Sequence, residues 1–587
     1  MKTRRLLPLL AVGIVISGLV VACSWTPWRK PVAQTAPSRD RLKLVWVSLD
    51  GFQPEALRPW LSKMSTHHPR GIQWLIDSAR GNSSVKVASP TITAPSHIST
   101  LTCVGSGEHG IMDNSMWTGT EMVVGFNRKY APQNWVTALR DQGLRVGVAM
   151  YPSIDATADD RKADVGSFYD NPGSSPQILS FDGTLKSLAF TVPSRSGDQA
   201  PYQMEFQRGT DGSVSVVTPW GVVGPLELAK PVDVLFTANI GGVERRAGIS
   251  FMALTRDAAF DSIEVSPVQV MPAYDESLQK AIDERGLVFS ALRDYRFQSN
   301  QKAFLATMDH RNSALMTLNE MLIERQDLDA VMLYFEDLDA LLHAYYKDSD
   351  RETDVVAFLE RFDQKLGRLL TKIPETADLL VVGDHGMSAI SYVLNSRKIL
   401  GADIASKGLI AGGGGTLYFY PPKGALDQDP PSDLNLEAVA ESLRQMDFDL
   451  TGAKLFGKVI VRGTPEAAAE GLTGKNLPWI MAFANDGVGF KNSMEDKLLL
   501  ARAKWAEIPE ALREKYPDPI LNGKLQVPVP AGQHGHWNEI PQMRTRLVLE
   551  GPRLGQIDPA RIQSMLELVP AVADAQKWER PSGCKAK

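Results

Sequence analysis

Four short segments of the chain carry aspartates and histidines at spacings that suit a metal site. They are Asp50-Gly51, Asp339-x-x-x-His343, Asp384-His385-Gly386-Met387 and His534-Gly535-His536. Carboxylate oxygens and imidazole nitrogens both suit zinc. Asp339 and His343 are four residues apart, so in a helix they lie on the same face. Asp384 and His385 are adjacent, and Gly386 permits the irregular backbone that they need to serve one metal.

A lone Asp-x-x-x-His pair is usually no more than the polar face of a helix. The joint pattern says more, because three of the acids follow predicted strands. Asp50 follows the first strand, Asp339 comes shortly after a strand that ends near Phe335, and Asp384 follows the apolar run 379–382. Ligands of open α/β sheets bind beyond the carboxyl ends of the strands. We therefore expect these acids at one edge of one sheet.

A candidate nucleophile, Thr93, lies in the segment 90–97, just before a predicted helix. The N–H groups and the dipole at a helix start favour a phosphate oxygen there. A zinc ion lowers the pKa of a bound hydroxyl and so activates it at neutral pH. Without the metal residues, a plain N-cap threonine would be the better interpretation.

Alternating strands and helices must position these residues. The sequence predicts buried strands at 44–49, 330–335 and 378–382, and further strands at 84–88 and 144–150. Helices are predicted at 95–104, 134–142, 313–325 and 354–371. Such alternation implies βαβ units, an α/β class and a central, mainly parallel sheet flanked by helices.

Two regions interrupt this pattern. Residues 172–272 alternate in short runs with many turn residues and predict a β-rich insertion. Residues 401–529 are mixed and complete the catalytic domain, whose core we assign to 42–171, 273–400 and 530–575. The glycine run 412–415 lacks the Gly-x-x-x-x-Gly-Lys pattern of a nucleotide P-loop.

The N-terminus predicts a secreted lipoprotein. Lys2, Arg4 and Arg5 precede a 17-residue apolar run that ends at Ala22, directly before Cys23. Residues 1–23 are typical of a lipoprotein signal peptide followed by a lipidated cysteine, Cys23, which becomes the new N-terminus on cleavage. The alternative is a short, uncleaved membrane span. Residues 24–41 are expected to form a tether, and the protein to lie in the bacterial envelope, facing the periplasm from the outer membrane.

The net charge and the cysteine count bear on the binding partners and on disulfide bonds. The chain has 587 residues and a net charge of −5. Cleavage would remove three positive charges, giving −8, so no broad contact with a nucleic-acid duplex is expected. Cys103 and Cys584 would then be the only cysteines, and we expect no disulfide between them. No feature of the sequence predicts an oligomeric state.

The motifs together resemble the alkaline phosphatase superfamily, and within it the type I phosphodiesterase/nucleotide pyrophosphatase family. The family's Pro-Thr-x-Thr-x-Pro-x-His segment is matched at 90–97, and its His-Gly-Ile with a nearby Asn at 109–114. Its acid-and-His helix motif, its Asp-His-Gly-Met and its closing His-Gly segment follow in family order at 339–343, 384–387 and 534–538.

The resemblance implies two zinc ions. One would be bound by Asp50, Thr93, Asp384 and His385, and the other by Asp339, His343 and His534. It also implies that Thr93 attacks phosphorus and forms a covalent phospho-threonine, which water hydrolyses. Asn114 would bind a non-bridging oxygen, while His97 and His109 would brace the helix and loop. His536 competes with His534 as a ligand, and His534 is preferred because it precedes the glycine.

The implied substrate is a small phosphate ester or nucleotide. A monoester dianion needs more positive charge than a diester, and Asn114 is neutral, which favours a diester or pyrophosphate. Phosphomonoesterase activity, with Arg161 and Lys162 in a suitable region, and phosphonate hydrolysis remain open. An alternative of another class is a non-catalytic, metal-binding envelope lipoprotein, against which the complete ligand set argues.

Overall fold

The computed structural model describes the chain from residue 41 to residue 584. The segments left out of this description are 155–159, 168–176, 181–185, 191–201, 211–212, 241–242, 256–259, 272, 290–291, 293–300, 347–351, 425, 449–451, 475, 493–498, 502–519, 522–523 and 526–530. The predicted signal peptide, Cys23 and all of the tether but its last residue therefore lie outside the described residues.

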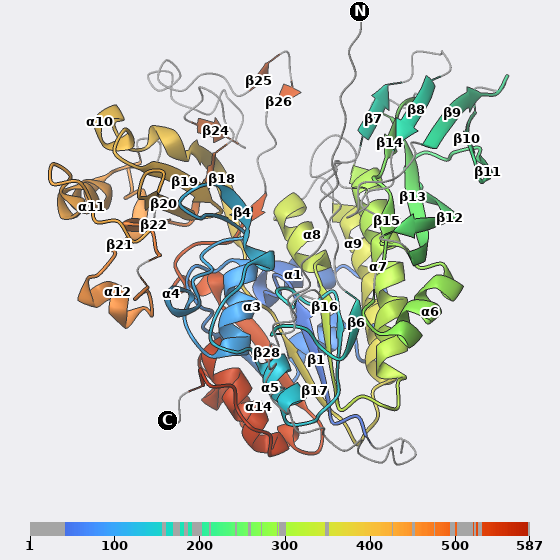
Figure 1. The fold of residues 1–587 in the computed structure, drawn as a ribbon, viewed down its shortest axis with the longest axis horizontal. Helices are drawn as coiled ribbons and strands as arrows, with labels where there is room; N and C mark the ends of the chain where they lie inside the picture. The colour runs from blue at the N-terminus through green and yellow to red at the C-terminus, as the bar shows by residue number, and fades with distance from the viewer. Residues whose placement is uncertain are drawn as a thin grey trace, which may run out of the picture. The chain divides into compact units, whose positions relative to one another are not determined.

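A seven-stranded sheet forms the centre of the fold (Figure 1). In spatial order its strands are β2 (Gly81–Val85), β28 (Thr545–Glu550), β17 (Asp378–Val382), β1 (Leu44–Leu49), β16 (Ala330–Phe335), β5 (Val146–Ala149) and β6 (Val165–Ser167). The strands from β17 to β6 are parallel, and β28 runs antiparallel to its neighbours. The predicted α/β class and mainly parallel sheet are confirmed.

Helices cover both faces of this sheet, because its inner strands are apolar on both sides. Val45 and Val47 of β1 point into one core, whereas Leu44 and Trp46 point into the other. The first core is closed by α1 (Pro54–Leu61), α7 (Gln301–Ile323), α8 (Asp337–Tyr345) and α9 (Glu352–Thr371). The second is closed by α3 (Thr93–Thr102), α5 (Trp135–Asp141) and α14 (Leu568–Gln576).

Antiparallel sheets supplement the central one. Between residues 177 and 270, one sheet has the order β11-β10-β9-β8 and a second has β12-β13-β14-β7. These strands are β7 (Gln177–Ser180), β8 (Lys186–Phe190), β9 (Tyr202–Arg208), β10 (Val214–Thr218), β11 (Gly221–Val223), β12 (Val232–Ile240), β13 (Val243–Thr255) and β14 (Phe260–Val265). The two sheets share a core of their own. The domain boundaries themselves stay a prediction.

A further antiparallel sheet belongs to the second interruption of the core. Its order is β19 (Leu409–Gly413), β20 (Thr416–Tyr420), β22 (Ile480–Ala484) and β21 (Phe456–Val461). Helix α11 (Leu436–Gln445) contributes Val439 and Leu443 to the apolar core of this sheet. The glycine run forms the tight connection from β19 to β20, with Gly414 at a φ of +57°. These glycines therefore serve a hairpin.

The predicted helices all differ from the structure at their starts, and two of these differences matter for the site and the core. Helix α3 begins at Thr93 and not at residue 95, so the threonine itself is the first helical residue. Helix α7 begins at Gln301, twelve residues before the predicted start at 313. Residues 303–308 include several buried apolar side chains, which extend the helix across the first core.

Cys103 and Cys584 are joined by a disulfide, so the expectation of two free thiols was wrong. Cys103 ends α3 in the left-handed conformation, with a φ of 60°. The C-terminal tail packs back on this helix end, since a Cβ placed on Gly583 would lie 2.3 Å from the carbonyl oxygen of Thr102. That contact follows from tertiary packing and leaves no trace in the local sequence.

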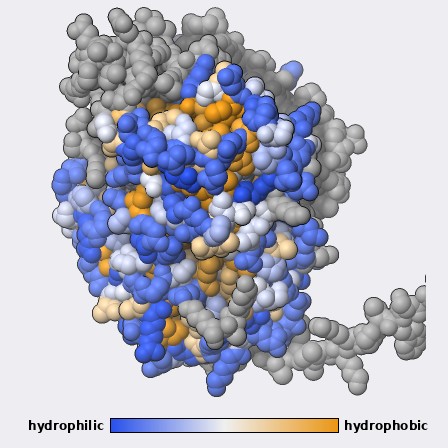
Figure 2. All heavy atoms as spheres, turned by 90° about the vertical axis from the view of Figure 1, so that its left-hand side faces the viewer, coloured by the Kyte–Doolittle hydropathy of each residue, from blue (hydrophilic) through white to orange (hydrophobic). Residues whose placement is uncertain are grey.

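None of the helices in the described part of the chain is long and apolar enough to cross a membrane. On the face seen in Figure 2, hydrophilic side chains cover most of the described surface and apolar side chains show between them.

Candidate metal centre and nucleophile

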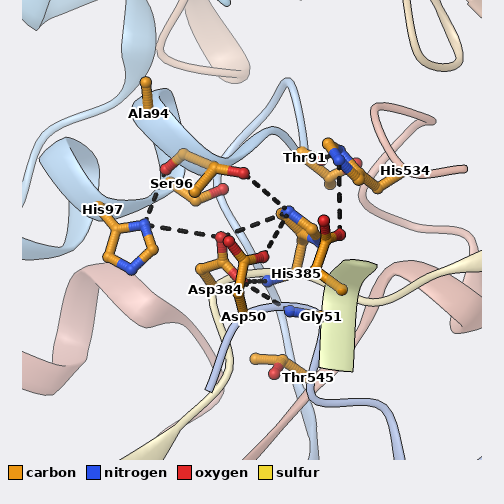
Figure 3. A network of polar contacts seen from close by, with 12 residues as sticks. Asp50, Gly51, Thr91, Ala94, Ser96, His97, Asp384, His385, His534 and Thr545 are labelled. Carbon is orange, nitrogen blue, oxygen red and sulfur yellow. Dashed lines mark hydrogen bonds and ion pairs between the residues drawn. The ribbon is translucent and has the colours of Figure 1, made fainter. Parts of the chain in front are cut away.

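The predicted ligands meet at the carboxyl edge of the central sheet. Asp50 directly follows β1, Asp384 comes two residues after β17, and Asp339 lies in the first turn of α8, which follows β16. His534 joins them through strand pairing, because Ser388 pairs with Gln533. In Figure 3, the side chains of Asp50, Asp384, His385 and His534 converge on one place.

Asp50, Asp384 and His385 form the first ligand group. The Nε2 atom of His385 lies 3.3 Å from Oδ1 of Asp50 and 3.3 Å from Oδ2 of Asp384. All three side chains are buried. The other oxygen of Asp384 accepts hydrogen bonds from the backbone N–H of Gly51 and of His385, which fixes this carboxylate.

Asp339, His343 and His534 form the second group. Oδ2 of Asp339 lies 3.4 Å from Nε2 of His343, and Oδ1 lies 3.7 Å from Nε2 of His534. The imidazoles of His385 and His534 stack with their centroids 3.8 Å apart, so the two groups adjoin. All six Asp and His residues that the resemblance implies as ligands are thus brought together.

The donor atoms of both groups fit metal ions. His343, His385 and His534 each direct Nδ1 to a backbone carbonyl, at 2.8, 3.0 and 3.1 Å respectively. Nδ1 therefore carries the proton and donates, which leaves Nε2 as a lone-pair donor. These Nε2 atoms face carboxylate oxygens at 3.3–3.7 Å, a repulsive arrangement unless a cation lies between them.

Orphaned oxygens support the same conclusion. Oδ1 of Asp50, Oδ1 of Asp339 and Oδ2 of Asp384 are buried without a hydrogen-bond partner within the described part of the chain. An isolated buried carboxylate is costly unless it is paired, protonated or bound to a metal. One unpartnered oxygen per aspartate is what a shared pair of metal ions would require.

Burial and mutual repulsion perturb the pKa values of the site. Burial, and then the charges of Asp384 and Asp339, raise the pKa of Asp50 well above its usual value. Burial raises the pKa of Asp339 to about 7. Burial, followed by the neighbouring His385 and His343, lowers the pKa of His534 well below its usual value. A neutral His534 beside two acids, Asp50 and Asp339, that resist ionisation again fits a site for positive charge.

Thr93 lies at this metal centre. Its Oγ1 atom is 3.3 Å from Nε2 of His385, and its side chain is buried at the start of α3. Asn114 sits next to it, because its Oδ1 accepts a 2.8 Å hydrogen bond from the backbone N–H of Ala94. A hydroxyl, a metal-ligand cluster and a side-chain amide are therefore within reach of one phosphate group.

The remaining histidines of the motifs have other partners. His97 donates from Nδ1 to the carbonyl of Thr93 and accepts at Nε2 from the Ser48 hydroxyl, both at 2.9 Å. His109 lies 2.9 Å from Ser99 of α3. His536 is turned away from the metal groups, with Nε2 2.9 Å from the carbonyl of Val488.

Three positioning features were missed by sequence reasoning. The Tyr334 hydroxyl donates a hydrogen bond to Oδ2 of Asp50. The carbonyl of Thr91 accepts from Nδ1 of His534 and from the N–H of Gly535. The glycine hairpin packs on the same segment, since the N–H of Gly415 donates to the carbonyl of His534. Of these three features, only Thr91 could have been found from sequence, because it lies in the same motif as Thr93, two residues before it.

Arg161, one of the two cations considered for a monoester, is engaged elsewhere. Its guanidinium donates to the carbonyl of Arg128, lies 3.5 Å from Asp160 and stands over the ring of Tyr130. The carbonyl of Lys162 accepts from Arg140. These contacts anchor the segment after residue 159 to the protein.

Known proteins resemble this chain in sequence and in fold. The family model described as type I phosphodiesterase/nucleotide pyrophosphatase matches residues 44–506. Human ectonucleotide pyrophosphatase/phosphodiesterase family member 7 is 23% identical over 318 residues, which make up 48% of this chain and 67% of that protein.

Two solved structures align with this chain at low sequence identity. Phosphonoacetate hydrolase from Sinorhizobium meliloti 1021, in complex with phosphonoformate, aligns with a TM-score of 0.50 and 13% identity, covering 92% of this chain and 96% of that one. Murine ectonucleotide pyrophosphatase/phosphodiesterase 5 aligns with a TM-score of 0.47 and 14% identity, with the same coverage of 92% and 96%. Because the family model spans most of the chain, the protein belongs to the type I phosphodiesterase/nucleotide pyrophosphatase family of the alkaline phosphatase superfamily and is a hydrolase of that family.

Proposed function

We propose that the protein hydrolyses phosphodiester or pyrophosphate bonds with two zinc ions and Thr93 as nucleophile. Asp50, Asp384, His385 and Thr93 would hold one ion, and Asp339, His343 and His534 the other. The two adjoining ligand groups beside Thr93 carry this proposal. When bound, the ions supply positive charge at the reacting phosphate and lower the pKa of the threonine hydroxyl.

The proposed reaction has two steps, and both use residues at the start of α3. Oγ1 of Thr93 forms a bond to phosphorus as the bond to the leaving oxygen breaks, which gives a phospho-threonine. Water then cleaves this ester and restores the hydroxyl. The hydrogen bond from His97 to the carbonyl of Thr93, and that of Ala94 to Asn114, hold the first turn of α3 in place for both steps.

The neutral side chain of Asn114 favours a substrate whose reacting phosphate carries one negative charge. Since its Oδ1 is used by Ala94, its Nδ2 is oriented as a donor, and it has no hydrogen-bond partner among the residues that the structure describes. A neutral amide donor suits the non-bridging oxygen of a phosphodiester or pyrophosphate. The name of the human relative, a nucleotide pyrophosphatase/phosphodiesterase, supports the same class of substrate.

Replacement of Thr93 tests the mechanism. We expect Thr93→Ala to lose at least about a thousandfold in kcat on bis(p-nitrophenyl) phosphate, because the nucleophile is removed. Thr93→Ser keeps a hydroxyl and should keep part of the activity. Thr100→Ala removes a hydroxyl from the same helix, where it bonds to Ser96, and should act as wild type. A Thr93→Ala protein as fast as wild type would refute the proposal.

We further propose that Cys23 is lipidated and anchors the protein to the bacterial envelope, facing the periplasm. The Cys103–Cys584 disulfide supports this location, because such bonds persist in oxidising compartments. In cell fractionation, wild type should follow the membranes, and Cys23→Ser should be released into the soluble fraction. Equal partition of the two proteins would contradict the anchor.

A further inference from the structure

Tyr334 lies beside the metal centre without belonging to either ligand group. It is the fifth residue of β16 and pairs in register with Ser48 of β1, two residues before Asp50. Its hydroxyl donates a hydrogen bond to Oδ2 of Asp50. Strand pairing therefore fixes both partners of this bond on neighbouring strands.

The two oxygens of Asp50 have different surroundings. Oδ2 is occupied by Tyr334, whereas Oδ1 lies 3.3 Å from Nε2 of His385 and has no hydrogen-bond partner in the described residues. The oxygen that faces the other ligands of its group is thus the one left free. A carboxylate held in this way presents one defined oxygen to the other ligands, and rotation of the group would break the hydrogen bond from Tyr334.

We propose that Tyr334 is a positioning residue that holds Asp50 as a single-oxygen metal ligand. This inference rests on the proposed two-metal function. The hydrogen bond from the Tyr334 hydroxyl also stabilises the charged form of the Asp50 carboxylate, which the carboxylates of Asp384 and Asp339 repel. Some residues outside the ligand shell orient the metal ligands. Removal of such a residue commonly lowers metal affinity by about 10- to 100-fold.

The ring of Tyr334 is itself held in place. It lies edge-on to His97, with centroids 5.5 Å apart, and His97 is fixed by hydrogen bonds to Ser48 and to Thr93. Replacement by Phe keeps this ring packing and removes only the hydroxyl. Tyr151 offers a matched control, because it packs on the same imidazole at 5.2 Å and its hydroxyl interacts with Ser48.

Zinc titration of metal-free protein against a chromophoric chelator tests this role. We expect Tyr334→Phe to bind one of two zinc ions about 10- to 100-fold more weakly than wild type, while Tyr151→Phe binds both as wild type does. Unfolding midpoints of the metal-free proteins report whether each variant folds. Unchanged affinity in a folded Tyr334→Phe protein would overturn the role of Tyr334.

A double-mutant cycle separates positioning of Asp50 from general damage. In an Asp50→Asn background, Tyr334→Phe should weaken zinc binding by less than about twofold further, because the partner is already lost. A full additional loss there would overturn the proposal. If wild type binds fewer than two zinc ions, the proposed function fails together with this inference. If wild type binds two and Tyr334→Phe matches it, only the inference fails.

Discussion

At the scale of single residues, the candidate metal centre brings together buried acids that repel one another and a histidine that carries no charge to balance them. Asp50, Asp339 and Asp384 each bury an oxygen that lacks a partner within the described residues. The neighbouring His534 is held neutral by its lowered pKa and so cannot compensate them. A site of this kind lowers the stability of the metal-free protein and is stabilised by whatever cations it binds.

The pH dependence of metal-free stability follows from these residues. Burial raises the pKa of Asp339 from 3.8 to about 7, so the folded state holds a proton that the unfolded state releases. The contribution of Asp339 to stability therefore falls as the pH rises from about 4 to about 7, whereas His534, with its lowered pKa, contributes in the opposite sense. Thermal unfolding of the chelated protein across this range measures the effect.

Asp339→Asn supplies the control for this titration. The variant keeps the shape of the side chain and removes the ionisable group, so its metal-free stability relative to wild type should rise as the pH increases from 4 to 7. Asp50, whose pKa is also raised, and His534, whose pKa is lowered, contribute to the dependence in both proteins. A difference in metal-free stability between wild type and Asp339→Asn that stays constant through this window would contradict the raised pKa of Asp339.

At the scale of elements, the glycine hairpin between β19 and β20 fixes the last ligand segment. A Cβ on Gly414 would lie 2.3 Å from the carbonyl oxygen of His534, and one on Gly415 would lie 2.5 Å from the ring of His536. Glycine is required here because the hairpin backbone touches the segment that carries His534. The hairpin therefore positions a proposed metal ligand although it contributes none.

Gly414→Ala should weaken metal binding more than its backbone strain explains. Gly414 has a φ of +57°, and Gly143, with a φ of +82° and open space around it, is a matched control. Alanine at either position costs about 1 kcal/mol of stability from the left-handed conformation. Only Gly414→Ala also displaces His534, so it should lose zinc affinity and activity in the titration and kinetic assays.

Equal behaviour of the two alanine variants would show that the hairpin does not hold His534. The comparison is informative because both substitutions impose the same kind of backbone strain, so a difference in zinc affinity reports the contact with the ligand segment alone. The unfolding midpoint of metal-free Gly414→Ala should be lowered more than that of Gly143→Ala, because only the Cβ at position 414 meets a backbone atom, at 2.3 Å.

Elements buried on both sides were predicted accurately from sequence. Strands β1, β16 and β17 have the predicted bounds, because continuous apolar runs leave no other interpretation. The acids at their ends were located for the same reason. Strand β2 spans Gly81–Val85 and not 84–88, since two of its residues are exposed and its sequence is polar. Tyr334 was missed because an aromatic residue in a strand is expected to pack.

At the scale of the whole molecule, contacts between distant segments complete the site. The proposed ligands come from segments at residue 50, around 340, at 384 and at 534, and helix α3, with the proposed nucleophile Thr93, comes from a fifth segment. Helix α3 is held at both ends: Thr93 contacts the metal centre at its start, and Cys103 is bonded to the C-terminal tail at its end. No local pattern could have predicted this second attachment, because its partners are 481 residues apart in sequence.

Removal of this disulfide should lower stability and leave the chemistry intact. The bond closes a loop of nearly the whole chain, and losing such a bond typically costs about 2–5 kcal/mol. We expect Cys584→Ser to unfold at lower denaturant concentration than wild type, and reduced wild type to behave like the variant. Near its own optimum temperature, the variant should keep kcat, because Cys103 lies at the end of α3 opposite to Thr93. A large loss of kcat in a folded Cys584→Ser protein would instead mean that the tail positions the nucleophile through the helix.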